Sequence, residues 1–203
     1  MSRYRGPRVR AMRALGVQLP GLSSKSHERR PYPPGQHGQA RRKVSEYGLR
    51  LLEKQKLSRN YGVSERQLRR LVIEARSADG PTGERLLELL ERRLDNVVFR
   101  AGFARTIPAA RQLVNHGHIM VDGRKVDRAS YSVGANQVIT LRERSRELPP
   151  VVGSIQAART FETSWLDVNA AERTAKMVQL PDAGSVPFPI TVQLVVEFYS
   201  QRL

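Results

Sequence analysis

A change of hydrophobic period at Gly117 constrains the fold of this 203-residue chain more than any other feature. Before it, Leu113 and Val114 lie on the apolar face of a helical pattern. After it, Ile119–Val121 reads as a short strand and is followed by Asp122–Gly123. Asp-Gly between two short strands is typical of a hairpin, because both turn positions need positive φ. The sequence therefore predicts a helix that closes at Gly117 and leads directly into a β-hairpin.

A second helix is predicted just upstream, and a third strand downstream. Leu94, Val97 and Val98 form one apolar helical stripe, which Gly102 ends. A strand over residues 137–141 would complete a small antiparallel sheet. Two helices and a hairpin place polar and basic side chains at helix ends and turns. Phosphates are most easily bound at such positions.

Positive charge is concentrated in the first third of the chain. The sequence has 35 Lys and Arg against 19 Asp and Glu, a net charge of +16. Residues 1–60 hold 15 basic and 3 acidic residues, so they carry +12 and the remainder carries +4. This excess favours a polyanionic partner and disfavours an ordinary cytosolic enzyme. A disordered tail kept soluble by its charge is the alternative, although interleaved tyrosines that could stack on bases weigh against it.

No membrane association is expected. Prolines interrupt the basic third of the chain, so it offers no amphipathic anchor, and no apolar run is long enough to span a bilayer.

The order of these patterns predicts an α+β fold with three parts. Residues 1–42 are rich in Gly, Pro and Arg, and we expect an extended basic N-terminal arm that becomes ordered on binding. Residues 43–92 plus 173–203 are predicted to form a discontinuous helical domain. A small α/β module, two helices plus a short antiparallel sheet, is predicted at 93–172 as an insertion into this domain, with a loop and a helix covering it, and its basic helix ends and turns favour an RNA-binding module.

Two helix starts are predicted from capping residues. Ser64 with Gln67 three positions later is a capping box, and Thr106 offers an N-cap oxygen before Pro108. Helical spacing returns near the C-terminus, where Val195 and Tyr199 could cover the other helices.

Several motifs resemble the family of small-ribosomal-subunit protein four. The run from Thr106 to Val126 looks like the RNA-binding module named after that family. Other motifs resemble the ribosomal protein itself in order and spacing: Arg3–Pro7, Pro34–Gly38, Ser45–Gly48, Glu53–Lys56, Arg93–Val98 and Val196–Ser200. The resemblance runs nearly end to end and implies the same insertion of the module into a helical domain.

The resemblance implies a structural constituent of the small ribosomal subunit, not an enzyme or a homo-oligomer. Its partners would be small-subunit rRNA at a junction of the 5′ domain, messenger RNA where it enters the subunit, and neighbouring small-subunit proteins. Binding would nucleate assembly, and a protein interface would affect decoding accuracy. The location would be cytoplasmic ribosomes, or the stroma or matrix if an organelle encodes the chain.

Other functions are compatible with parts of the sequence. The same module occurs in RNA chaperones and modification factors, and a basic chain could also condense nucleic acid without preference. Arg93-Leu94-Asp95 superficially resembles the catalytic motif of pseudouridine synthases, but the Thr and Gly-Leu that those enzymes need do not follow. The acidic residues Glu88 and Glu91, with Glu84, could face solvent or a basic neighbour.

No metal or other cofactor is expected. His116 and His118 lack a third ligand nearby, and the chain has no cysteine. Some relatives carry a cysteine cluster in the arm that looks like a zinc site, and this chain resembles the cysteine-free form.

The expected RNA-binding residues fall into three groups. In the arm they are Arg3, Arg5, Arg8, Arg10, Arg13, Lys25, Arg41, Arg42 and Lys43. In the first helices they are Tyr47, Arg50, Lys54, Lys56, Arg59, Arg69 and Arg70. In the module they are Arg93, Arg105, Arg111, Gln112, His116, His118, Arg124 and Lys125.

Overall fold

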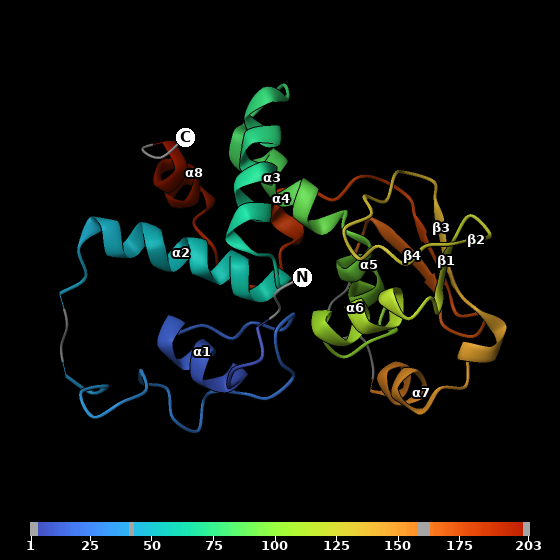
Figure 1. The fold of residues 1–203 in the computed structure, drawn as a ribbon, viewed down its shortest axis with the longest axis horizontal. Coiled ribbons are helices and arrows are strands. Elements are labelled where there is room, and N and C mark those ends of the chain that lie inside the picture. Colours follow the sequence, from blue (N-terminus) through green and yellow to red (C-terminus); the bar gives the residue numbers. More distant parts are fainter. Residues whose placement is uncertain (1–3, 41–42, 158–162, 201–203) are drawn as a thin grey trace. The chain divides into compact units, whose positions relative to one another are not determined.

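The computed structural model describes residues 4–40, 43–157 and 163–200, which form two compact units (Figure 1). The first unit comprises residues 1–86 with 186–203, and the second comprises 87–185. Helix α4, Thr82–Glu91, begins in the first unit and ends in the second. The α+β class, with a module inserted into a discontinuous helical domain, is confirmed. None of the helices among the described residues is long and apolar enough to cross a membrane.

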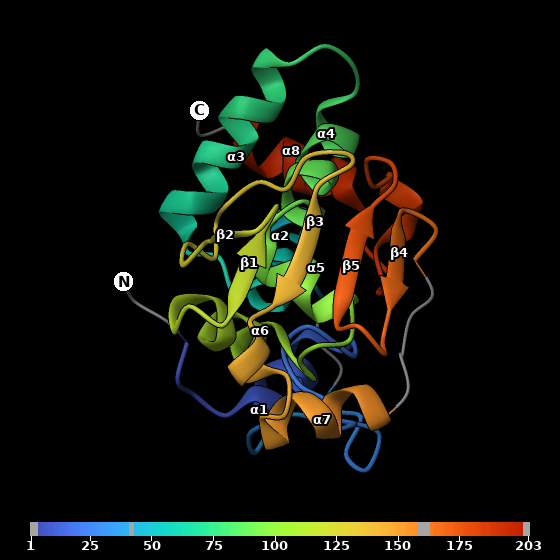
Figure 2. The ribbon, with the colours of Figure 1, turned by 90° about the vertical axis from the view of Figure 1, so that its right-hand side faces the viewer.

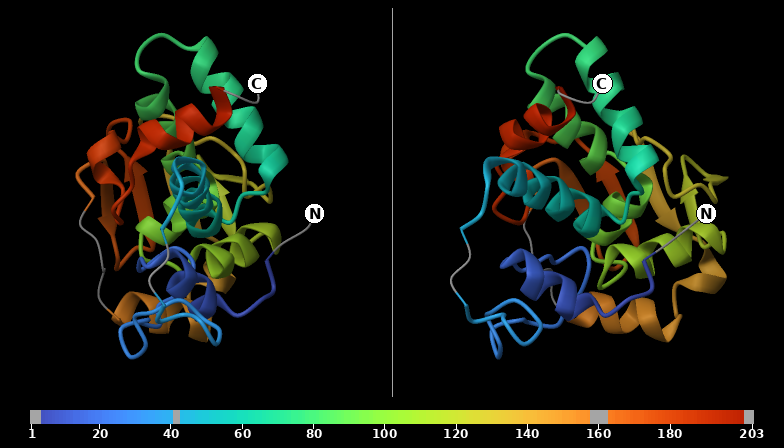
Figure 3. Two further views of the ribbon diagram at one scale, coloured as in Figure 1. Left: turned by 90° about the vertical axis from the view of Figure 1, so that its left-hand side faces the viewer. Right: turned by 60° about the vertical axis from the view of Figure 1, so that its left-hand side comes forward.

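The first unit is built from helices. Besides the start of α4, it contains α1 (Arg8–Leu15), α2 (Glu46–Tyr61), α3 (Glu65–Ser77) and α8 (Val192–Ser200). Helix α8 packs against α2 and α3, as the views in Figure 3 show for α2. The buried face of α8 consists of Val195, Phe198 and Tyr199. Its packing brings the end of the chain back to the first helices.

Part of the predicted extended arm is folded. Residues 8–15 form α1, which packs on α2, and Met12, Leu19 and Leu22 are buried. The backbone N–H of Gly21 donates to Oδ1 of the buried Asn60 at 3.0 Å. Three apolar side chains and one hydrogen bond to α2 therefore order this segment without RNA. Residues 22–40 and 43–45, the described part of the chain between this segment and α2, contain no helix or strand.

Both predicted caps are present. Ser64 accepts from the backbone N–H of Gln67, and the Gln67 side chain accepts from the backbone N–H of Ser64, a complete capping box for α3. Thr106 accepts from Ala109 N–H at the start of α6, Ile107–Asn115.

The second unit places α5 (Leu94–Arg100) and α6 against one face of an antiparallel sheet (Figures 1 and 2). The sheet has five strands in the order β2-β1-β3-β5-β4. The strands are β1 (Ile119–Val121), β2 (Arg124–Lys125), β3 (Val138–Leu141), β4 (Leu166–Asn169) and β5 (Thr174–Met177). The predicted hairpin is confirmed: Asp122 and Gly123 have φ of 48° and 76° between β1 and β2.

The segment after β3 is more structured than the predicted loop and helix. It contains the 3-10 turn η1 (Glu143–Ser145), helix α7 (Pro149–Gln156), then β4 and β5, and the 3-10 turn η2 (Ala183–Ser185). Pairing of Ile139 with Ala175 joins β3 to β5, so residues 173–185 belong to the second unit and not with the C-terminal helix. Each missed strand is only four residues long, with few apolar positions to reveal it.

Candidate nucleic-acid interface

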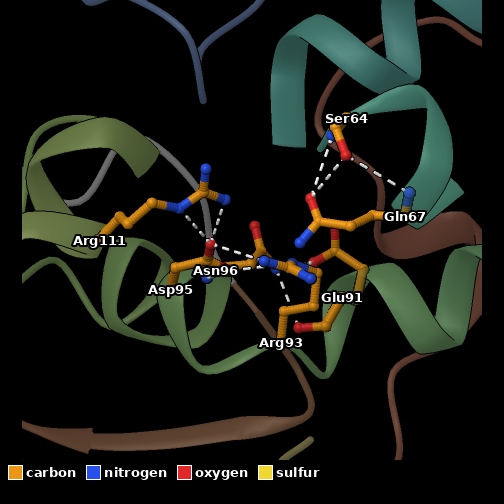
Figure 4. Close-up of polar contacts among 7 residues, drawn as sticks. All are labelled: Ser64, Gln67, Glu91, Arg93, Asp95, Asn96 and Arg111. Carbon is orange, nitrogen blue, oxygen red and sulfur yellow. Dashed lines mark hydrogen bonds and ion pairs between the residues drawn. The ribbon is translucent and has the colours of Figure 1, made fainter. Parts of the chain in front are cut away.

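A buried carboxylate, Asp95, holds two arginines at the base of the module. Arg93 donates to it from Nε at 3.1 Å and Nη2 at 2.9 Å, and Arg111 donates from Nε at 3.0 Å and Nη2 at 2.5 Å (Figure 4). Its Oδ1 also accepts from Asn96 N–H at 3.0 Å. The exposed fraction of the side chain is 0% for Asp95, 6% for Arg93 and 16% for Arg111.

This position gives two residues of the expected RNA-binding set a role within the protein itself. Arg93 is buried with its guanidinium bonded to Asp95, so it stabilises the fold. Arg111 is half-buried and is also held by Asp95, which fixes α6 to the start of α5. Asp95 is thus a structural residue, where the sequence alone shows only its place in a first helical turn.

A second buried carboxylate, Glu91, fixes the end of α4 to α5. Its Oε2 accepts from Asn96 Nδ2 at 2.9 Å and from Arg100 Nε at 3.0 Å, and its backbone carbonyl also accepts from Asn96. The Nη2 of Arg100 donates to the carbonyl of Ser185. Because Glu91 is fully buried, it faces neither solvent nor a neighbouring protein, the two alternatives that the sequence leaves open.

The turn between α6 and β1 carries the polar edge of the module. Gly117 has φ of 73°, and a Cβ there would collide with Cε of Lys125, so the Lys125 side chain lies over the turn. His116 is exposed, while Nδ1 of the half-buried His118 lies 2.9 Å from Ser145 Oγ. Burial, and then the charges of His116 and Arg142, lower the pKa of His118. His118 therefore sits beside positive groups and contacts the Ser145 hydroxyl.

The hairpin completes this edge. Arg124 and Lys125 on β2 are exposed. The Asp122 carboxylate accepts from Val138 N–H at 2.9 Å and from Gln137 Nε2 at 2.8 Å, which ties the hairpin tip to β3. A rigid tip presents its two cations in a fixed position.

Two other expected residues of the module, Gln112 and Arg105, are also exposed. Gln112 lies on α6. Arg105, just before that helix, donates from Nη2 to Gly153 O in α7 at 2.8 Å.

In the first unit, the expected cations of α2 are largely paired. Arg50 bonds Glu197 at 2.9 Å, Lys54 bonds Glu65 at 2.8 Å, and Lys56 bonds Glu53 at 2.5 Å. The guanidinium of Arg59 lies over the Tyr4 ring, 4.1 Å from its centroid. Tyr47 is 46% exposed, and its ring centroid is 5.9 Å from that of Phe198. These partners reduce the positive charge that α2 offers to phosphates.

Helix α3 presents the most accessible basic face of the first unit. Arg66, Arg69, Arg70 and Arg76 are exposed around Ile73, which is itself 51% exposed. None of the four arginines forms an ion pair within the described residues, in contrast to the cations of α2. Arg66 and Arg76 were not among the expected contacts, although their helical spacing from Arg69 and Arg70 already indicates a shared face.

The arm contributes further exposed cations. They are Arg5, Arg8, Arg10, Lys25 and Lys43. Arg13 is half-buried, with its guanidinium 5.1 Å from the centroid of the Tyr32 ring. A Cβ at Gly38 would collide with the carbonyl of Pro33, so this tight turn requires glycine. Arg3, Arg41 and Arg42 lie outside the described residues.

Comparison with known families identifies the class of protein to which these surfaces belong. Residues 3–91 match the model of the ribosomal protein S4/S9 N-terminal domain, and residues 92–139 match the S4 domain. The two matches meet within one residue of the end of α4. The chain is therefore a ribosomal protein with RNA-binding domains.

Full-length relatives identify the family. Small ribosomal subunit protein uS4 of Methylobacillus flagellatus is 54% identical over 205 residues, covering 100% of both chains. The uS4B protein of Nitrosomonas europaea and the uS4 protein of Synechococcus elongatus are each 53% identical, again over 100% of both chains. The chain belongs to the uS4 family of small ribosomal subunit proteins. It is a structural ribosomal protein and not an enzyme, which sets aside the synthase alternative.

Proposed function

We propose that this chain is a primary binder of small-subunit rRNA, and that it clamps a helical junction of the 5′ domain with two surfaces. The first surface is the α3 face with Arg66, Arg69, Arg70 and Arg76, together with the basic arm. The second is the edge of the module, formed by the 116–118 turn and the hairpin cations Arg124 and Lys125. The observation that carries the proposal is that both surfaces expose basic side chains, whereas the cations of α2 are paired.

The chemistry of these surfaces fits RNA backbone and shape more than base sequence. Guanidinium and ammonium groups on helix faces and turns bind phosphate oxygens, which position a protein without reading bases. The module is stiffened by Asp95 and Glu91, so its edge would keep one geometry on binding. A rigid edge on one unit and a basic helix on the other suit a folded RNA target that presents two backbone segments.

Three more specific roles belong to the same proposal. Early binding at such a junction would nucleate assembly of the subunit. Lys43, exposed beside Arg41 and Arg42, would line the opening through which messenger RNA enters. A neighbouring small-subunit protein would share an interface that affects decoding accuracy. The chain would act as one copy per subunit, in cytoplasmic ribosomes or in the stroma or matrix if an organelle encodes it.

The test compares two variants that each remove three positive charges from the first unit. One is Arg66→Gln, Arg69→Gln and Arg70→Gln on α3, and the control is Arg50→Gln, Lys54→Gln and Lys56→Gln on α2. Binding to small-subunit rRNA is measured across a salt titration. Each lost phosphate contact lowers the slope of log affinity against log salt by about 0.7–0.9.

We expect the slope of log affinity against log salt to fall in magnitude by about 2 to 3 in the α3 variant and by about 1 or less in the α2 variant. If the α3 variant retained the slope of the unaltered protein, α3 would not be an RNA surface and the clamp would have to be abandoned.

A further inference from the structure

A basic segment outside the matched S4 domain lies at the same edge of the module. The domain match ends at residue 139, and the 3-10 turn η1 follows β3 at Glu143–Ser145. Arg144 and Arg146 in and beside this turn are exposed. Neither was expected from the sequence to contact RNA.

Three contacts fasten this segment to the turn between α6 and β1. The backbone N–H of Arg142 donates to the carbonyl of His118 at 3.0 Å, and Arg142 Nη1 donates to the carbonyl of Gly117 at 3.4 Å. Ser145 Oγ lies 2.9 Å from His118 Nδ1, and Ser145 is only 1% exposed. In Figure 2 the chain after β3 accordingly turns beside the end of α6. The segment is therefore a fixed part of the module's edge.

The arginines of this segment are available to a partner. Within the described residues, neither Arg144 nor Arg146 forms an ion pair, although the exposed Glu143 and Glu147 flank them in the sequence. Arg142 and the Lys125 side chain meet at the same turn and balance these two carboxylates, so the charges of Arg144 and Arg146 give the region a net positive charge. The lowered pKa of His118, caused by burial and then by the charges of His116 and Arg142, is consistent with this local excess.

We propose that Arg144 and Arg146 are RNA phosphate contacts, which extend the binding edge from the hairpin and the 116–118 turn onto η1. The RNA-binding surface of the second unit would then be longer than the matched S4 domain. The proposal rests on the proposed function, because it takes RNA as the partner of this edge. Continuity with Arg124 and Lys125 favours RNA over an acidic protein as the partner of the segment.

The test uses the full chain with single substitutions that each remove one positive charge. Arg144→Ala and Arg146→Ala are compared with Lys176→Ala, which alters an exposed lysine on β5 that pairs with Val138, at the end of β3 opposite to η1. Binding is measured across a salt titration to small-subunit rRNA and to a length-matched unrelated RNA. Because all three side chains are exposed, the urea unfolding curve monitored by Trp165 fluorescence should be unchanged in each variant.

We expect Arg144→Ala and Arg146→Ala each to lower the salt slope on small-subunit rRNA by about 0.7–0.9, and Lys176→Ala to leave it unchanged. Slopes equal to that of the unaltered protein would overturn the inference and leave an acidic protein as the partner of η1. An equal loss in Lys176→Ala would also overturn it, because the effect would then be general charge.

The proposed function is contradicted by a different result, namely that the unaltered protein shows no preference for small-subunit rRNA over the unrelated RNA. The slope changes on the unrelated RNA would still decide whether the two arginines contact phosphate.

Discussion

Replacing Asp95 by alanine should strongly destabilise the second unit. The carboxylate is fully buried and accepts from Nε and Nη2 of each of two arginines, whose side chains are themselves 6% and 16% exposed. Removing one partner of a buried ion pair costs about 3–5 kcal/mol, because the remaining charges stay desolvated and unpaired. The upper part of that range is expected, since Asp95 is shared by Arg93 and Arg111. Asp95→Asn should cost less, because an amide oxygen still accepts a hydrogen bond.

Urea unfolding followed by tryptophan fluorescence measures this cost in the right unit. Trp165 is the single tryptophan of the chain, is fully buried, and lies in the second unit. With a slope of about 1.5 kcal/mol per molar urea, the loss should lower the midpoint by about 2–3 M. Asp127→Ala, which removes an exposed aspartate of the same unit, should change the free energy of unfolding by less than about 0.5 kcal/mol. An Asp95→Ala midpoint within about 0.5 M of the unaltered protein would refute the view that this carboxylate holds the module together.

Four further predictions concern stability. Leu113→Asp should abolish cooperative unfolding of the second unit by burying a charge, while Gln112→Asp on the exposed face of α6 should preserve it, both read from Trp165 fluorescence. Ser64→Ala should lower the stability of the first unit by about 1 kcal/mol, read from far-UV circular dichroism. Because the pKa of His118 is lowered in the folded protein, the unfolded chain binds a proton at this residue at a higher pH, near the ordinary pKa of 6.5, than the folded protein does. Stability should therefore fall with acidification in that range, and His118→Asn should flatten the dependence in urea titrations at several pH values. Alanine at 41–43 should leave the thermal transition unchanged, and a lost transition would contradict the view that these residues contribute no core.

Features encoded within a few residues could be predicted from the sequence. The capping box at Ser64 and Gln67 and the hairpin turn at Asp122–Gly123 each depend on side chains or φ values inside one short motif. The helical stripe of α6 and its closure at Gly117 are local in the same sense. The interactions that form these elements lie within a few residues of one another and do not depend on distant parts of the chain.

Features that depend on distant partners could not be predicted. Arg111 reads as an exposed cation on α6, but its partner Asp95 lies 16 residues upstream. Helix α1 is ordered by burial of Met12 and by α2, which a Gly- and Pro-rich composition conceals. Leu49 is an apolar residue of α2 and yet is exposed, because the packing of α8 and α1 determines which surface of the helix is buried.

The candidate site divides along the same line. The sequence shows which residues are basic, and the structure shows which of them are exposed and unpaired. Arg50 pairs with Glu197, which lies 147 residues further along the chain, and Lys54 pairs with Glu65 on the next helix. Arg144 became a candidate only through the contacts that fasten η1 to His118.

The most direct test of the RNA-binding account is the affinity of the unaltered protein for small-subunit rRNA and for a length-matched unrelated RNA, each across a salt titration. Phosphate contacts alone weaken equally on both RNAs as salt rises, whereas recognition of a folded junction persists. We expect a preference of about a thousandfold or more that is retained at high salt, within the range of specific over non-specific binding. Equal affinities that collapse together with salt would contradict site recognition and leave a basic protein without a specific RNA target.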